Sequence, residues 1–219
     1  MEMNKDHESL NIQEALQYAF WLFDQGKLDE ANQAYERLWQ QHAGMTEAQK
    51  RTLLMGTMYV QVALGRYDLA IADGKKLLGM STGFGDRHTA LHQLAMAYRA
   101  AGEYSQALGH LSRSALSSSS RVGMTFAWPS HGYELSVVAI KQKRFDEAEH
   151  ILMDSLRRAE IANDAMTLGC LYRAWGELGQ ATGRLAESKH HFGIAVDFFE
   201  TAGDQIAARE AKALMDNLA

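Results

Sequence analysis

Cysteine and proline are almost missing from this sequence, which has one of each among 219 residues. A single cysteine, Cys170, excludes an internal disulfide bond, and without a CxxC partner it is expected to be a small buried side chain. A single proline, Pro129, leaves long stretches in which helices can run without interruption. The 18 glycines gather at expected turns. This composition favours an all-α protein over a β-sheet protein.

Long hydrophobic runs and strong charge are also missing. No apolar run approaches the roughly 20 residues that a membrane-spanning helix needs, and the opening MEMNKDHESLN lacks the apolar core of a signal peptide. We therefore expect a cytoplasmic protein that does not enter a membrane. The net charge of −5 is mild and dispersed, so nucleic acid is not an expected partner.

A turn of the form Gly-x-Tyr-x-x-Ala recurs through the chain, with apolar residues at helical spacing before and after it. It is anchored at residues 26, 65, 102, 143 and 183, which gives periods of 39, 37, 41 and 40 residues. A repeat length in this range indicates a stacked array of helix pairs. The turns themselves occupy 26–31, 65–70, 102–107, 143–148 and 183–188.

Each position of the turn has a physical reason. Glycine adopts a left-handed conformation without steric cost, whereas Lys143 in the fourth turn either costs roughly 1–2 kcal/mol or makes a different turn. The small residue at the end of the motif allows two helices to approach closely. The residue two positions after the anchor is predicted to fill the hairpin core, namely Leu28, Tyr67, Tyr104, Phe145 and Leu185.

Helix boundaries follow from capping signals. Asn11 with Glu14, and Thr46 with Gln49, are predicted capping boxes, and Asp86 is the expected cap of the fifth helix. Proline is tolerated in a first helical turn, which places the seventh helix at about 127–142. We expect a polar segment over 1–10 and a single domain over 11–218, with units at about 11–44, 46–80, 86–118, 127–162 and 164–202 and a capping helix at 205–218.

The chain resembles tetratricopeptide (TPR) repeats. The turn motif carries this resemblance, and Trp175-Gly176 and Leu94-Ala95 with Tyr98 match further family positions. The long period is similar to that of kinesin light chains and of Rap-type bacterial regulators. The resemblance implies a right-handed superhelical solenoid of five helix hairpins, whose first helices line a concave groove.

The resemblance also implies a non-catalytic scaffold or adaptor that binds a protein or peptide segment of amphipathic or acidic character. Methionine and aromatic residues at helical spacing are equally typical of a core, but the repeat register favours the groove. The carboxylate-clamping pattern of some members is not visible here. The residues expected to line the groove are Phe20, Met55, Tyr59, His92, Met96, Arg99, Tyr133, Val137, Lys141, Arg173 and Glu177.

Other functions remain open from sequence alone. A peptide-sensing regulatory subunit, or a self-associating assembly subunit such as a homodimer, is the first alternative, although the ten residues before the first repeat leave no room for the additional domains of Rap-type regulators. An enzyme using His92, Tyr133 and Glu177 is a remote alternative, because no convergent acid, base and nucleophile are evident. His88 and His92 lack a third metal ligand, so neither a metal nor a cofactor is expected.

Overall fold

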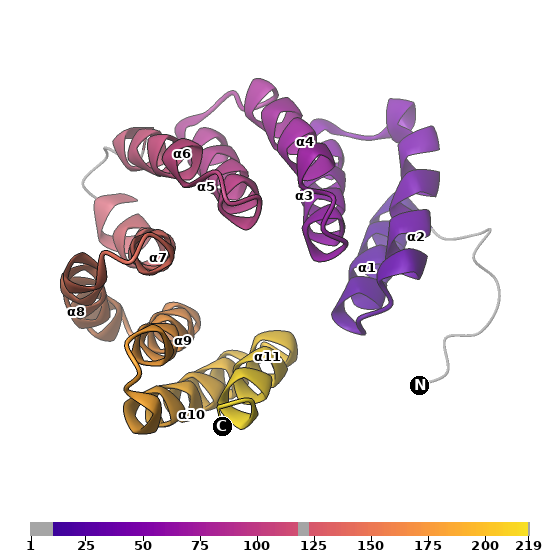
Figure 1. Cartoon of the computed structure of the whole chain (residues 1–219). Helices are drawn as coiled ribbons and strands as arrows, with labels where there is room; N and C mark the ends of the chain where they lie inside the picture. The colour runs from indigo at the N-terminus through magenta and orange to yellow at the C-terminus, as the bar shows by residue number, and fades with distance from the viewer. Residues whose placement is uncertain (1–10, 118–122, 219) are drawn as a thin grey trace. The chain divides into compact units, whose positions relative to one another are not determined.

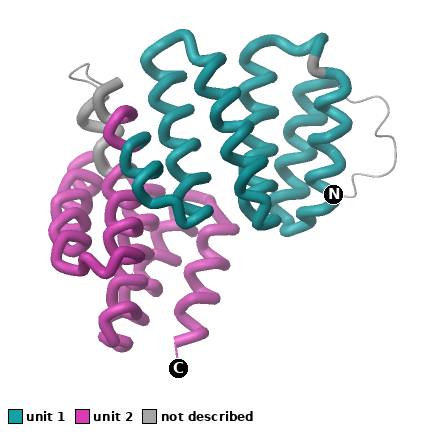
Figure 2. The backbone as a smooth tube through the Cα atoms, turned by 45° about the horizontal axis from the view of Figure 1, so that its top comes forward, with its two compact units in different colours: residues 1–110 teal, residues 111–219 magenta. Residues whose placement is uncertain are grey.

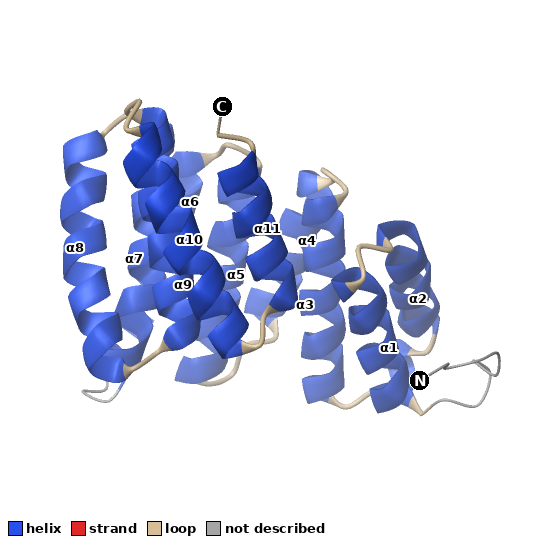
Figure 3. Ribbon diagram, turned by 90° about the horizontal axis from the view of Figure 1, so that it is seen from below, coloured by secondary structure: helices blue, strands red, loops and turns tan. Residues whose placement is uncertain are grey.

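The computed structural model describes residues 11–117 and 123–218, and every regular element among them is helical (Figures 1 and 3). The all-α prediction is confirmed, while the predicted polar segment 1–10 lies outside the described residues. The elements are α1 (Ile12–Asp24), α2 (Leu28–Gln40), a 3-10 turn (His42–Gly44), α3 (Glu47–Ala63), α4 (Tyr67–Gly79), α5 (Phe84–Ala100), α6 (Tyr104–Ser117), α7 (Gly123–Lys141), α8 (Phe145–Ala162), α9 (Ala165–Ala181), α10 (Leu185–Ala202) and α11 (Gln205–Asp216).

The chain forms two compact units, residues 1–110 and 111–219, which meet inside α6 (Figure 2). In the first unit α1 packs on α2, α3 on α4, and the first helices α1, α3 and α5 contact one another in sequence. In the second unit α7 packs on α8, α9 on α10, α7 on α9, and α10 on α11. Each unit is therefore a stack of helical hairpins, and the single domain expected over 11–218 stays a prediction.

Local signals set most helix ends correctly. The side chains of Asn11 and Thr46 accept hydrogen bonds from the backbone of Glu14 and Gln49, so both predicted capping boxes are present. The cap at Asp86 is wrong: α5 begins at Phe84 with Gly83 as its cap, and Asp86 instead approaches Arg51 of α3 at 3.5 Å. Helix α7 begins at Gly123, so Pro129 lies beyond the first turn in which we expected it.

The five hairpin turns share one backbone geometry. Gly26, Gly65, Gly102 and Gly183 have φ values of 72°, 70°, 79° and 77°, and Lys143 has a φ of 60°. The residue after each anchor donates a hydrogen bond to the carbonyl five positions earlier, as Lys27 does to Leu22 and Arg144 to Ala139, both at 2.9 Å. This is the Schellman pattern that closes helix C-termini. The alternative of a different fourth turn is therefore wrong.

Close helix contact depends on small residues beside large ones. A Cβ atom at Gly176 would lie 2.5 Å from the ring of Phe192, and one at Gly169 would lie 2.7 Å from Phe199. Ser188, the small residue of the fifth turn, is fully buried and donates a hydrogen bond to the Gly176 carbonyl at 2.7 Å. Rings of α10 therefore lie directly on the backbone of α9.

Two of the residues expected to fill the hairpin cores do not do so. Tyr67 and Leu185 retain 37% and 43% of their surface exposed, whereas Leu28, Tyr104 and Phe145 are partly buried. All five side chains are the first residue of a second helix, so this position at a helix end does not ensure burial. The small residues three positions later, such as Ala70 and Ser188, are fully buried.

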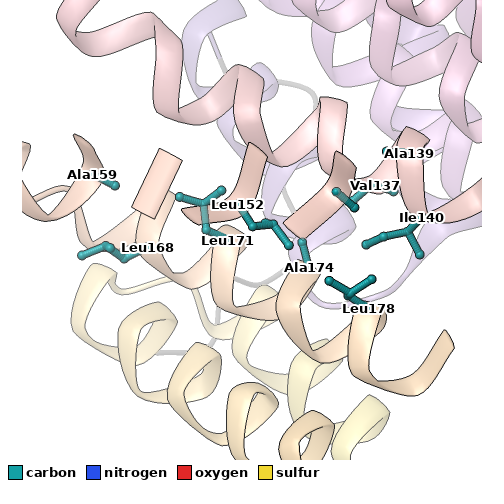
Figure 4. Close-up of a cluster of buried hydrophobic side chains, with 10 residues drawn as sticks. Val137, Ala139, Ile140, Leu152, Ala159, Leu168, Leu171, Ala174 and Leu178 are labelled. Carbon is teal, nitrogen blue, oxygen red and sulfur yellow. The ribbon is translucent and has the colours of Figure 1, made fainter. Parts of the chain in front are cut away.

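Each unit has its own apolar core. In the second unit, residues of α7, α8 and α9 interdigitate around Leu152, Leu171 and Ala174, all fully buried (Figure 4). In the first unit the core joins α1, α2 and α3 around Leu22, Tyr35 and Leu53. These cores hold the first helices in place and leave one face of each available for other contacts.

Replacing Lys143 with glycine should stabilise the protein, because Lys143 holds a left-handed conformation that costs an L-residue about 1 kcal/mol. Urea unfolding of Lys143→Gly should show a midpoint increase equivalent to about 1 kcal/mol. Gly183→Ala is the matched control and should lose a similar amount, since its φ is 77°. A destabilised Lys143→Gly variant would contradict the strain that we assign to this turn.

Gly176→Ala should destabilise the protein by about 1–3 kcal/mol, because the new methyl group overlaps the buried ring of Phe192. Gly109→Ala is the control: it lies inside α6 with nothing within 4 Å of the new Cβ, and helix propensity should stabilise it by about 1 kcal/mol. Thermal unfolding of both variants measures the contrast. Equal effects of the two changes would show that close packing at Gly176 is not limiting.

Candidate binding site

Aromatic side chains form a strip on the first helices of unit 1. The ring centroids of Phe20 and Phe23 on α1 are 6.0 Å apart, and those of Phe23 and Tyr59 on α3 are 6.1 Å apart. Phe20 is 49% exposed, while Phe23 and Tyr59 are partly buried. We call Phe20, Phe23 and Tyr59 the aromatic strip. It offers stacked apolar surface on two adjacent first helices.

A polar contact connects the aromatic strip to the next first helix, α5. Burial raises the pKa of Tyr59, and a side-chain hydrogen bond with Gln93 of α5 opposes that rise. Met55 lies one helical turn before Tyr59, and Met55 and Met96 are both partly buried. Flexible thioether side chains beside aromatic rings suit a surface that adapts to an apolar ligand.

His92 lies on α5 in a buried and locally positive setting. Burial, together with the nearby His88 and Arg99, lowers the pKa of His92 to about 4. His92 is therefore neutral near pH 7, and its imidazole can exchange hydrogen bonds without bringing a charge to this surface. Arg99, one of the predicted contact residues, supplies the permanent charge on the same helix.

A polar cluster occupies the first helices of unit 2. The guanidinium of Arg173 on α9 lies 3.4 Å from the carboxylate of Glu177 and 2.7 Å from that of Glu210 on α11. Burial alone would lower the pKa of Arg173, but Tyr133 of α7 and the two glutamates raise it. Arg173 is thus a fixed positive charge. We call Tyr133, Arg173, Glu177 and Glu210 the Arg173 cluster.

Of the predicted residues, Phe20 and Tyr59 belong to the aromatic strip, and Tyr133, Arg173 and Glu177 belong to the Arg173 cluster. The others lie outside both groups, among them Met55 on α3 and His92, Met96 and Arg99 on α5. Val137 is 1% exposed inside the core of unit 2, so its assignment to a binding surface is wrong: its side chain packs between α7 and α9. Lys141 is exposed at the last residue of α7. Glu210 was not predicted, because α11 was treated as a cap; aligning α11 as a further first helix would have indicated it.

The expected preference for acidic partners loses part of its basis. Arg173 already has two carboxylate neighbours within its own unit, which leave it little net positive field. Arg99 and Lys141 are the remaining cations among the residues proposed for partner contact. Any acidic ligand group at Arg173 must therefore compete with Glu177 and Glu210.

The described residues contain neither a cluster of metal ligands nor a helix suited to a membrane. Within residues 11–117 and 123–218, no three His, Cys, Asp or Glu side chains are grouped to hold a metal ion. No helix in that part of the chain is long and apolar enough to cross a membrane.

The fold is similar to several known structures. A thermophilic TPR protein of Thermus thermophilus, TTC0263, aligns over 94% of this chain and 99% of its own, with 19% identity and a TM-score of 0.62. PlcR of Bacillus thuringiensis, in complex with the peptide PapR7 and DNA, aligns over 98% of this chain and 77% of its own, with 14% identity and a TM-score of 0.71. The apo form of RapI gives 10% identity and a TM-score of 0.59, and this chain spans 61% of the RapI chain.

Sequence comparison adds no closer relative. No protein-family model matches the chain, and no curated protein matches it. The structural likeness nevertheless defines the class: this is a helical-repeat protein with a TPR-like solenoid fold, as the turn motif predicted.

Acidification should destabilise the protein through His92. The unfolded chain binds a proton at this residue near pH 6.5, whereas the folded protein binds it only near pH 4. The stability is therefore complete above about pH 6.5 and is lost as the pH falls toward 4, by about 3 kcal/mol at most.

Urea unfolding between pH 7 and 4 measures this loss. His92→Leu should show a weaker dependence on pH than the wild type. His190→Gln, a change on the exposed surface of α10, is the control. If His92→Leu and the wild type lose stability in parallel, His92 is not the titrating group.

Proposed function

We propose that this protein is a non-catalytic module that binds a peptide or an extended protein segment on the exposed faces of its first helices. Its fold is that of TPR-like proteins, and one of the similar structures, PlcR, is in complex with a peptide. The first helices α1, α3 and α5 contact one another within unit 1, so a bound segment can touch several repeats at once.

The observation that carries this proposal is the aromatic strip. Phe20 is 49% exposed although its ring is tilted against that of Phe23 at 6.0 Å, and Phe23 in turn stacks against Tyr59 of the next first helix. Covering the exposed half of a phenylalanine contributes about 1 kcal/mol to binding. Partly buried aromatic anchors of this kind supply much of the energy of protein interfaces.

The side chains in and around the aromatic strip indicate what kind of partner segment would bind there. Stacked rings with Met55 nearby favour an apolar or aromatic side chain of the partner. Polar groups at the α5 end, Gln93 and Arg99, can bind backbone carbonyls or an acidic side chain. An amphipathic segment with an apolar anchor therefore matches the surface of unit 1.

Self-association is the second candidate, and it is favoured by one observation. Trp21 of α1 is 45% exposed and stacks against Tyr18, with centroids 5.8 Å apart. Tryptophan is enriched at protein–protein interfaces, so this half-exposed indole offers a surface for a second copy of the chain. Sedimentation of the purified chain at micromolar concentration tests this candidate, and a monomer would exclude it.

The peptide-binding proposal predicts that Phe20→Ala weakens binding. Random 12-residue peptides are selected on the full chain, and the affinity of the enriched peptides is then measured by calorimetry. Phe20→Ala should weaken binding by about tenfold, because the anchor contact is lost. Phe84→Ala is the matched control, since Phe84 is 78% exposed on α5 and lies outside the aromatic strip.

Three results would count against the proposal. They are the absence of any enriched peptide, equal weakening by both variants, and weakening by Phe84→Ala alone. Circular dichroism of each variant, with helicity equal to the wild type, ensures that lost binding does not reflect lost folding.

A further inference from the structure

The last helix has a small apolar anchor. Helix α11 packs on α10 through Ala208 and Ala211, which meet Ala195 and Phe199. Alanine side chains bury little surface, and burial stabilises in proportion to the area removed from water. The helix is also short, from Gln205 to Asp216, and short helices depend on tertiary contacts. Polar contacts to neighbouring helices therefore matter more for α11 than for the helices inside the stack.

One such contact ties α11 to α9. Nη1 of Arg173 lies 2.7 Å from the carboxylate of Glu210, and the two side chains are 24% and 55% exposed. Ion pairs with this much exposure contribute little net stability and are weakened by salt. The bond is short but half open to water, so Glu210 can leave Arg173 at low cost.

Arg173 itself remains in place when Glu210 leaves. Its side chain is largely buried, and its Nε still faces Glu177, one turn along the same helix at 3.4 Å. The guanidinium group of arginine presents several N–H donors in a planar fork that matches a carboxylate. The position that the Glu210 carboxylate occupies is therefore suited to a carboxylate from another molecule.

We propose that Arg173 is a subsite for a carboxylate of the bound segment, and that Glu210 is an intramolecular competitor whose displacement releases α11 from α9. This inference rests on the proposed peptide-binding function and extends it to unit 2. A ligand shifts α11 only as far as it binds the released state better than the docked state. The partner feature that it selects is an aspartate, a glutamate or a terminal carboxylate.

The single cysteine of the chain reports on this release. Cys170 lies on α9 and packs against the same alanine cluster that anchors α11. Burial raises the pKa of its thiol to about 12, so the docked protein should react slowly with a thiol reagent. Departure of α11 removes part of that cover and should speed the reaction.

The experiment measures the reaction of Cys170 with an uncharged disulfide reagent, 4,4′-dithiodipyridine, in the full chain, because a reagent without a carboxylate does not itself compete for Arg173. Glu210→Gln should speed the reaction about threefold to fivefold, because the competitor loses its charge. Glu187→Gln is the matched control: Glu187 is 58% exposed and pairs with Arg184 at 3.3 Å on α10, away from α11. Its rate should equal that of the wild type.

A second arm tests the carboxylate subsite with succinate as the probe. At equal ionic strength, succinate should speed the reaction of the wild type more than sodium chloride does, because it competes with Glu210 for Arg173. Arg173→Gln should react quickly and should not respond to succinate beyond the chloride effect. Glu210→Gln should respond much less than the wild type, because its Arg173 has no charged competitor from α11 for succinate to displace.

Several outcomes would overturn the inference. They are equal rates for Glu210→Gln and Glu187→Gln, identical effects of succinate and chloride on the wild type, and rates that follow global unfolding in urea for every variant. A failure here leaves the Phe20 experiment untouched, since that experiment tests a surface in unit 1. If no peptide binds the chain but succinate still speeds the reaction of Cys170, the peptide-binding function is wrong, while Arg173 still binds a carboxylate.

Discussion

The structure depends on a left-handed residue at the end of each first helix. The five hairpin anchors, Gly26, Gly65, Gly102, Lys143 and Gly183, have positive φ and reverse the chain with the same pair of backbone hydrogen bonds. That reversal brings the two helices of a hairpin so close that a small residue of one helix stands at each tight contact, as Gly176 does against Phe192. Lys143 adopts the same conformation without being glycine, which shows that the packing around the turn sets the geometry more strongly than the residue does.

Close packing in turn decides which faces remain for binding. Rings from α10 lie on the glycines of α9, and the fully buried small residues Ala31 and Ala148 keep α2 and α8 in contact with α1 and α7. The second helices thus pack on the first helix of their own hairpin and also on the helix that follows, as α4 does on α3 and α5. The first helices contact one another along only part of their surface, and both candidate groups, the aromatic strip and the Arg173 cluster, lie on first helices.

The two groups differ in chemistry, and that difference has a physical origin. Phe23 and Tyr59 stack because the adjacent helices α1 and α3 bring their rings to 6.1 Å, and Phe20 lies 6.0 Å from Phe23 on α1 itself. In unit 2 the corresponding helix α9 carries the charged pair Arg173 and Glu177, and Glu210 of α11 adds a second carboxylate beside Arg173. An apolar ligand group therefore matches unit 1 and an acidic group matches unit 2, where it meets a competitor.

Periodicity predicted the helices, and capping residues predicted most of their ends. Helical periodicity predicted less accurately which individual side chains are buried and which are exposed. The repeat register gives Val137 and Tyr133, four residues apart on α7, the same role, yet Val137 is fully in the core while Tyr133 packs at its edge and remains partly exposed. Tyr67 and Leu185 occupy a position that the repeat pattern treats as core and are nevertheless exposed. A repeat register fixes a residue's angle on its helix only approximately, and the boundary between core and surface is narrow.

The sequence by itself determined the hairpins, because turn geometry and helix periodicity are local properties of a few neighbouring residues. It also determined the class of protein, since a recurring 37- to 41-residue period allows few architectures. Only the tertiary structure decided which side chains meet. Arg173 and Glu210 are 37 positions apart, and their contact depends on how α9, α10 and α11 pack. Charge pairing across helices follows from that packing, which no single stretch of sequence encodes.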